Sequence, residues 1–312
     1  MTAFHQIPQD ILVREGRAQV GDIELHYEDW GSPEHPAILL VMGLSAQMLL
    51  WPAGFCELLV RKGFRVIRFD NRDIGLSTQI KVRSKPMNEL LRMARFSLGF
   101  KSPCPYSLYD MAGDCLGLLD HLGIRQAHVV GASMGGMIAQ ILAGRHGERV
   151  LSLGVIFSSN NQPLLPPPAP AALAPLMKGP GKGATREQLI AHSKKLMRTI
   201  GSPEFPNPDE ELEGFASMLL ERSYHPAGVK RQFMAVLSSG SLRPLAKSIK
   251  APTAVIHGLD DILVRPACGR AIARSIKGAK LHLIPGMGHD LPRVLWPMFA
   301  DMLADNFRRA TA

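Results

Sequence analysis

One serine, Ser133, stands between small residues in the stretch VVGASMGGMI, which covers residues 129–138. Its hydroxyl could attack a carbonyl carbon, but a glycine-rich turn from a strand into a helix could also bind a phosphate. The phosphate-binding alternatives fail on spacing, because the stretch lacks the second glycine of G-x-G-x-x-G and no G-K-[ST] follows. What remains is G-x-S-x-G, a pattern that exposes a nucleophile on a strained turn.

A serine hydroxyl is a weak nucleophile near neutral pH, so this chemistry needs a base and a group that orients the base. Asp261 follows the strand-like run APTAVIHG, and His289 follows the run KLHLIPG. In a parallel sheet, both would lie in loops just past the carboxyl ends of their strands. The chain therefore offers a nucleophile, an acid and a base in the order Ser133, Asp261, His289.

The elements that must position these residues alternate between strands and helices. Apolar or alternating runs typical of strands cover 18–31, 37–43, 63–73, 127–130, 149–159, 251–258 and 280–286. The first of them turns at Gly21 and Asp22, as in a hairpin. Helical spacing of apolar residues covers 106–124 and the segment after Ser133. This alternation predicts an α/β fold with a mainly parallel twisted sheet and helices on both faces.

One long segment breaks the alternation. Strand signals disappear from residue 160 to about 243, beginning with a proline- and glycine-rich stretch, 161–183, in which we expect no regular structure. Helices are expected to follow at 185–201, 209–224 and 227–240. We therefore predict a helical cap at 159–245 inserted into a core of 22–158 and 246–312, with an N-terminal extension at 1–21.

Several longer stretches carry a resemblance to a known family: LLVMGLSAQMLLWP, VIRFDNRDIGLST, YSLYDMAGDCLGLLDHLGI, HVVGASMGGMIAQ, IHGLDDILV and LIPGMGHDLP. From about residue 22 onward the chain resembles the α/β-hydrolases, and within them the esterase and methylesterase branch that includes the aclacinomycin methylesterases. The resemblance implies a serine hydrolase that cleaves a carboxylic ester, hydrophobic or methyl, through an acyl-enzyme. It implies no cofactor and no metal ion.

The resemblance also implies a role for each matching residue. Ser133 would be the nucleophile and His289 the base. Asp261 would orient the imidazole, because the acid of this family usually stands three residues after the glycine that is Gly258 here; the neighbouring Asp260 is the competing assignment. The backbone amides of two further residues would form the oxyanion hole, namely Leu44 and Met134.

The substrate is less well defined by the sequence. Met42, Trp51 and Met287 lie in or beside the expected active-site loops and could line an apolar pocket, although core packing is the alternative for each. The same triad could hydrolyse a lactone, a thioester or a carbon–carbon bond. From another class, the fold could serve as a small-molecule receptor or interaction module without turnover.

Charge and composition limit the kinds of partner that the protein is expected to bind. The formal net charge is +9, and the segment 61–101 contains eleven basic residues against three acidic ones. That segment lacks the aromatic interleaving of single-strand binders, so we expect a solvated basic face and a small-molecule substrate, not a nucleic acid. No window is apolar enough for membrane insertion, and the first 22 residues contain no continuous apolar stretch behind a basic start. The four scattered cysteines suggest neither disulfides nor zinc. We expect a soluble cytoplasmic protein; the sequence does not specify its oligomeric state.

Overall fold

A single eight-stranded sheet organises the computed structural model, which describes residues 8–82, 88–177, 179–181 and 183–310. Its strand order is β1-β2-β4-β3-β5-β6-β7-β8. The β1–β2 and β2–β4 pairs are antiparallel and all other neighbours are parallel, which confirms the predicted mainly parallel sheet. The strand bounds are β1 Val13–Val20, β2 Ile23–Trp30, β3 Ala37–Val41, β4 Arg65–Phe69, β5 Ala127–Ala132, β6 Val150–Ile156, β7 Thr253–Gly258 and β8 Lys280–Ile284.

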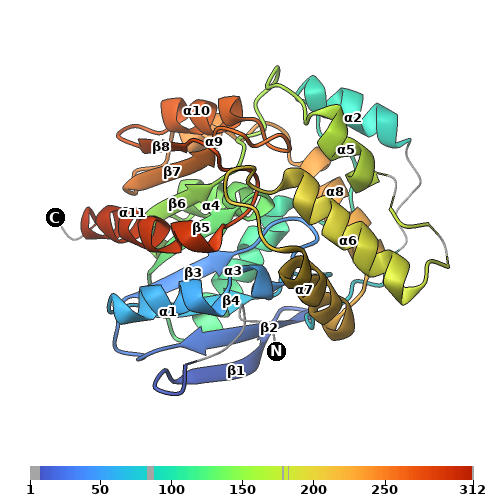
Figure 1. The fold of residues 1–312 in the computed structure, drawn as a ribbon. Helices are drawn as coiled ribbons and strands as arrows, with labels where there is room; N and C mark the ends of the chain where they lie inside the picture. Colours follow the sequence, from blue (N-terminus) through green and yellow to red (C-terminus); the bar gives the residue numbers. More distant parts are fainter. Residues whose placement is uncertain (1–7, 83–87, 178, 182, 311–312) are drawn as a thin grey trace.

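Helices cover both faces of this sheet (Figure 1). Every residue of the central strands β3, β5 and β7 is buried, as expected for parallel strands enclosed between two helical layers. One hydrophobic cluster lies under α1 (Ala53–Arg61) and α11 (Trp296–Arg308). The other lies under α3 (Leu108–His121), α4 (Met134–Arg145), α9 (Arg243–Ala246) and α10 (Pro266–Ser275). Short 3₁₀ turns occur at Met48–Leu50, Gly147–Arg149 and Arg293–Leu295.

Between β6 and α9 the described residues form four helices, which Figure 1 shows grouped together with α2 (Glu89–Ser97) to the right of the sheet. Helices α6 (Arg186–Ile200), α7 (Asp209–Arg222) and α8 (Pro226–Ser238) agree with the predicted helices to within two residues. The expectation of no regular structure in 161–183 is wrong, because α5 (Pro170–Met177) lies inside it. Pro170 takes the first helical position, where no N–H is needed, and the sequence AALA that follows favours a helix.

The sheet begins earlier than residue 22, where the predicted core begins. Strand β1 pairs with β2 along its whole length, from Val13 opposite Trp30 to Val20 opposite Ile23. The predicted turn at Gly21 and Asp22 joins the two strands, and Gly21 has the positive φ of 54° that favours glycine there. Residues 13–20 are therefore part of the main sheet.

The basic segment 61–101 differs from the predicted solvated face. Arg65, Arg68 and Arg92 are buried, with at most 9% of each residue exposed. Arg65 pairs with Asp29 at 2.9 Å, and Arg68 pairs with Glu28 at 2.7 Å. The predicted solvated face is thus wrong for these positions, while Arg83 and Lys85 lie outside the described residues. Within the described ranges, no helix is long and apolar enough to cross a membrane.

The buried pair of Arg68 and Glu28 makes a testable contribution to stability. The Arg68 guanidinium also donates to the carbonyl of Trp51, so Arg68→Met leaves this carbonyl without its donor and the Glu28 carboxylate without its charged partner, with only the Trp30 indole N–H still bound to it. We expect urea unfolding to show a loss of roughly 3–5 kcal/mol in the free energy of unfolding. Arg17→Met, which breaks an exposed pair with Glu24, is the control and should cost less than about 1 kcal/mol. Equal losses in the two variants would contradict this account.

Candidate active site

Ser133 occupies a strained turn between β5 and α4. Its backbone has φ 54° and ψ −123°, a combination that non-glycine residues rarely adopt. The Ser133 N–H donates to the carbonyl of Ile156 on β6 at 3.0 Å, which fixes the turn against the sheet. A Cβ atom on Gly135 would lie 2.0 Å from the Val41 carbonyl oxygen, so only glycine allows the start of α4 to approach β3 this closely.

The structure brings the three predicted chemical residues into one chain of hydrogen bonds. The Nε2 atom of His289 lies 3.0 Å from Ser133 Oγ, and its Nδ1 atom lies 2.8 Å from Asp261 Oδ2. In this arrangement Nδ1–H donates to the carboxylate and Nε2 can accept the serine proton. Asp261 comes from the loop after β7 and His289 from the loop after β8, which are neighbouring strands.

Asp261 is held as a buried carboxylate. Its Oδ1 atom accepts hydrogen bonds from the N–H groups of Leu263 (2.9 Å) and Val264 (2.8 Å). Burial by itself would raise the pKa of Asp261, but attraction to His289 and hydrogen bonds from His257 and His289 lower that pKa to about 2. The carboxylate therefore stays charged at neutral pH and can stabilise an imidazolium.

His257 is a neighbour of Asp261 that the sequence interpretation did not identify. Its Nε2 atom lies 3.5 Å from Asp261 Oδ2 and 2.7 Å from the carbonyl oxygen of Val264. The four-residue spacing between His257 and Asp261 at the end of one strand was the available signal. The Asp261 carboxylate therefore has two histidine neighbours, His257 and His289.

The competing acid, Asp260, is engaged elsewhere. Asp260 is exposed, and its Oδ2 atom accepts the N–H of Gly286 at 2.8 Å. It therefore ties the β7 loop to the β8 loop instead of contacting the imidazole. This geometry favours Asp261 as the residue that orients His289.

The two predicted oxyanion-hole residues lie beside Ser133. Met134 follows it directly, and Gly43, which precedes Leu44, packs so closely that an added Cβ would lie 2.9 Å from the Ser133 Cβ. In the part of the chain that the structure describes, no protein acceptor takes the N–H of Leu44 or of Met134. Among the described residues, neither amide is thus engaged by the protein.

The three predicted pocket residues, Met42, Trp51 and Met287, pack in the core instead. At most 4% of each is exposed, and all belong to the hydrophobic cluster under α1 and α11. Trp51 stacks on Phe55 with 5.9 Å between the ring centroids. Core packing, the alternative for each, is what the structure favours. Among the described residues, no three His, Cys, Asp or Glu side chains gather as ligands for a metal ion.

Comparison with known proteins decides the family. The family model described as "alpha/beta hydrolase fold" matches residues 36–292, most of the chain. The chain belongs to the α/β-hydrolase fold family. The predicted fold class and family resemblance are therefore confirmed.

This α/β-hydrolase is similar to curated enzymes along most of its length. It is 27% identical to rhodomycin D methylesterase DnrP of Streptomyces peucetius, over 93% of this chain and 97% of the relative. It is also 27% identical to a 2-hydroxy-6-oxononadienedioate/2-hydroxy-6-oxononatrienedioate hydrolase of Paraburkholderia xenovorans, over 89% and 88% of the two chains. The solved enol-lactonase of Burkholderia xenovorans LB400 superposes with a TM-score of 0.70 at 23% identity, over 94% and 100% of the two chains, and shares the fold.

The lowered pKa of Asp261 predicts a specific acid sensitivity. Because the folded-state pKa of about 2 lies below the ordinary 3.8, ionised Asp261 adds stability above about pH 4, and this is lost as the pH falls toward 2. Asp261→Asn lacks this contribution. We expect the difference in free energy of unfolding between wild type and Asp261→Asn to shrink by about 2 kcal/mol from pH 5 to pH 2.

Urea titrations at several pH values measure this difference, with Asp260→Asn as a control for substitution in the same loop. A difference between wild type and Asp261→Asn that does not change with pH would contradict the assigned cause.

Proposed function

We propose that this α/β-hydrolase cleaves a carboxylic ester with Ser133 as nucleophile. The observation that carries the proposal is the unbroken hydrogen-bond chain from Ser133 Oγ through His289 to Asp261. As Ser133 Oγ attacks the carbonyl carbon, His289 Nε2 takes the hydroxyl proton. Asp261 keeps Nδ1 protonated and stabilises the imidazolium that forms.

The remaining steps use the same residues. The backbone N–H groups of Leu44 and Met134 stabilise the negative oxygen of the tetrahedral intermediate. His289 then gives its proton to the leaving alcohol, which breaks the ester bond and leaves the acyl group on Ser133. Water, deprotonated by His289, attacks the acyl-enzyme and releases the acid. The proposed cycle requires no cofactor.

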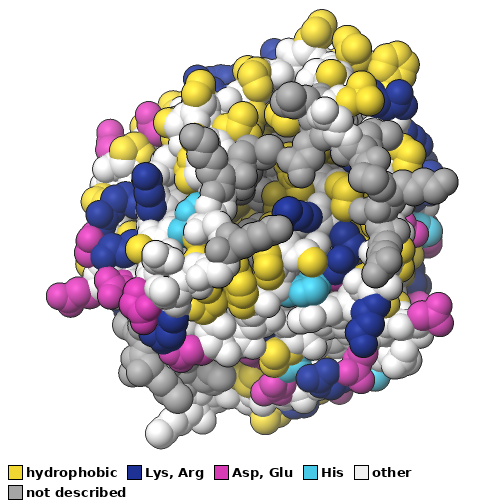
Figure 2. All heavy atoms as spheres, turned by 90° about the vertical axis from the view of Figure 1, so that its right-hand side faces the viewer, with side chains coloured by type: hydrophobic (Ala, Val, Ile, Leu, Met, Phe, Trp, Pro, Cys, Tyr) yellow, Lys and Arg dark blue, Asp and Glu magenta, His cyan; other side chains and the backbone are white. Residues whose placement is uncertain are grey.

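The family and its methylesterase relatives mark the chain as an esterase-type hydrolase. For the substrate we propose a small hydrophobic or methyl ester. The methylesterase relatives support this, and Figure 2 shows hydrophobic side chains gathered in the hollow on the face where α2, α6 and α8 lie. Segment 159–245 would act as the cap over this hollow, on a core of 22–158 and 246–312 to which the strand at residues 13–20 also belongs.

A second candidate reaction is carbon–carbon bond hydrolysis. It is favoured by the relative that is named as a hydrolase of 2-hydroxy-6-oxononadienedioate, a compound whose name describes no ester bond. Assays of the purified enzyme on nitrophenyl esters, a lactone, a thioester and a vinylogous diketone distinguish the candidates. Binding of an ester without turnover would instead support the receptor alternative.

For location we propose the cytoplasm. All four cysteines, Cys56, Cys104, Cys115 and Cys268, are free. Free cysteines are typical of proteins in reducing compartments.

Substitutions in the triad test the proposed roles. We expect Ser133→Ala and His289→Ala to lower kcat on a nitrophenyl ester by about 10⁴-fold or more, because each removes an atom that takes part in proton transfer. Asp261→Asn should lose a comparable factor through the wrong imidazole tautomer. Asp260→Asn is the matched control, with less than about a threefold change.

Circular dichroism shows whether each variant is folded. A larger loss in Asp260→Asn than in Asp261→Asn would overturn the acid assignment, and undiminished turnover by Ser133→Ala would overturn the proposed nucleophile.

A further inference from the structure

We propose that Gln232, on helix α8, is a positioning residue that fixes the loop 43–47 and so aims the Leu44 N–H at the reacting oxygen. The proposal rests on the proposed function, because the Leu44 amide matters only if an oxyanion forms next to Ser133. Gln232 lies about 190 residues from Leu44 in sequence and has no role in the triad. It reaches the site only because α8 packs against the core.

The Gln232 side chain bridges two loops. It is fully buried, and its Oε1 atom accepts the N–H of Ser45 at 3.0 Å. Its Nε2 atom donates to the carbonyl of Arg72 at 2.9 Å. Ser45 directly follows Leu44 and has a φ of 60°, so this contact holds a strained residue next to the predicted oxyanion donor. An amide suits this position because it carries a donor and an acceptor together.

Close contacts hold helix α8 against the loop that carries Asp73, and they thereby fix the helix from which Gln232 extends. The carbonyl oxygen of Asp73 would lie 2.1 Å from a Cβ on Gly228, which shows how closely the helix approaches this loop. Arg231 donates two hydrogen bonds of 2.8 Å to the fully buried Asp73 carboxylate. The two hydrogen bonds from Arg231 to Asp73 and the close approach of Gly228 to the Asp73 carbonyl together fix the position of Gln232 relative to the loop 43–47.

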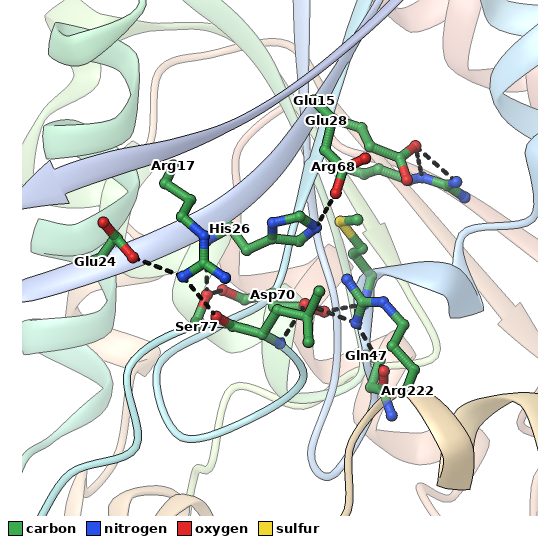
Figure 3. A network of polar contacts seen from close by, with 12 residues as sticks. Glu15, Arg17, Glu24, His26, Glu28, Gln47, Arg68, Asp70, Ser77 and Arg222 are labelled. Atoms are coloured by element: carbon green, nitrogen blue, oxygen red, sulfur yellow. Dashed lines mark hydrogen bonds and ion pairs between the residues drawn. The ribbon is translucent and has the colours of Figure 1, made fainter.

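The end of the loop 43–47 is held by α7, as Figure 3 shows for Gln47, Asp70 and Arg222. Arg222 donates to Gln47 Oε1 and lies against Asp70 Oδ2, both at 2.7 Å. Gln47 Nε2 in turn donates to the Leu219 carbonyl at 2.7 Å. Helix α7 therefore anchors the loop 43–47 at its end, Gln47. Gln232 on α8 holds the middle of the same loop through Ser45.

Substitution of Gln232 should therefore mainly weaken the stabilisation of the transition state. An oxyanion donor removed outright costs about 10²- to 10³-fold in rate, and a donor that is only misaligned should cost less. We expect Gln232→Met to lower kcat by roughly 10- to 100-fold with KM nearly unchanged. Gln232→Asn, which is too short to reach both partners, should show the same loss and serves if the Met variant does not fold.

The test measures the second-order rate constant for phosphonylation of Ser133 by a fluorophosphonate and the inhibition constant of a trifluoromethyl ketone. Both reagents place a developing negative oxygen in the oxyanion hole, and neither requires knowledge of the substrate. In the Gln232 variants the rate constant should fall, and the inhibition constant should rise, by the factor seen in kcat. Lys230→Met, an exposed neighbour on the same helix, is the control and should match wild type.

Wild-type protein that is not labelled at Ser133 overturns the proposed function itself. Labelled wild type with variants that react at the wild-type rate overturns only the role of Gln232. Variants that lose thermal stability or raise KM while keeping the wild-type inhibition constant also overturn it, since Gln232 would then be merely structural.

Discussion

The hydrogen bond between His289 Nε2 and Ser133 Oγ, at 3.0 Å, is the contact on which the rest of the site depends. It requires two loops from different parts of the chain to meet within a few tenths of an ångström. The parallel sheet makes this possible, because β5, β6, β7 and β8 are successive neighbours whose carboxyl ends share one edge. The strained turn at Ser133 places the hydroxyl at that edge. Close packing around the turn keeps the backbone in this strained conformation.

The helical insertion also helps to position His289, through hydrogen bonds to the loop that carries it. The N–H of His289 donates to the Ile200 carbonyl at the end of α6, at 2.7 Å. The N–H of Gly288 donates to Ser202 Oγ at 2.9 Å. With Gln232 bound to Ser45, and Leu219 and Arg222 bound to Gln47, the insertion touches both the histidine loop and the loop that carries Leu44. The insertion therefore supports the positions of the proposed catalytic groups.

The features that could be predicted from sequence are those that depend on local patterns. Buried strands appear as continuous apolar runs, and the turn around Ser133 needs glycine at fixed offsets, so both are visible along the chain. What could not be predicted depends on partners distant in sequence. A count of charges does not show that Arg68 would be buried against Glu28. The proline content of 161–183 hid α5, although Pro170 stands at the first helical position, where a proline is tolerated. The bridge made by Gln232 requires the packed position of α8, which no short motif encodes.

The central claim is that Ser133 carries the acyl group during turnover. Wild-type enzyme is mixed with a slowly deacylating ester, quenched in acid and digested, and the peptides are analysed by mass spectrometry. We expect one acyl group per chain, on the peptide that contains Ser133, and none in Ser133→Ala. An acyl group on another residue, or turnover with no acylated peptide at any time, would contradict it.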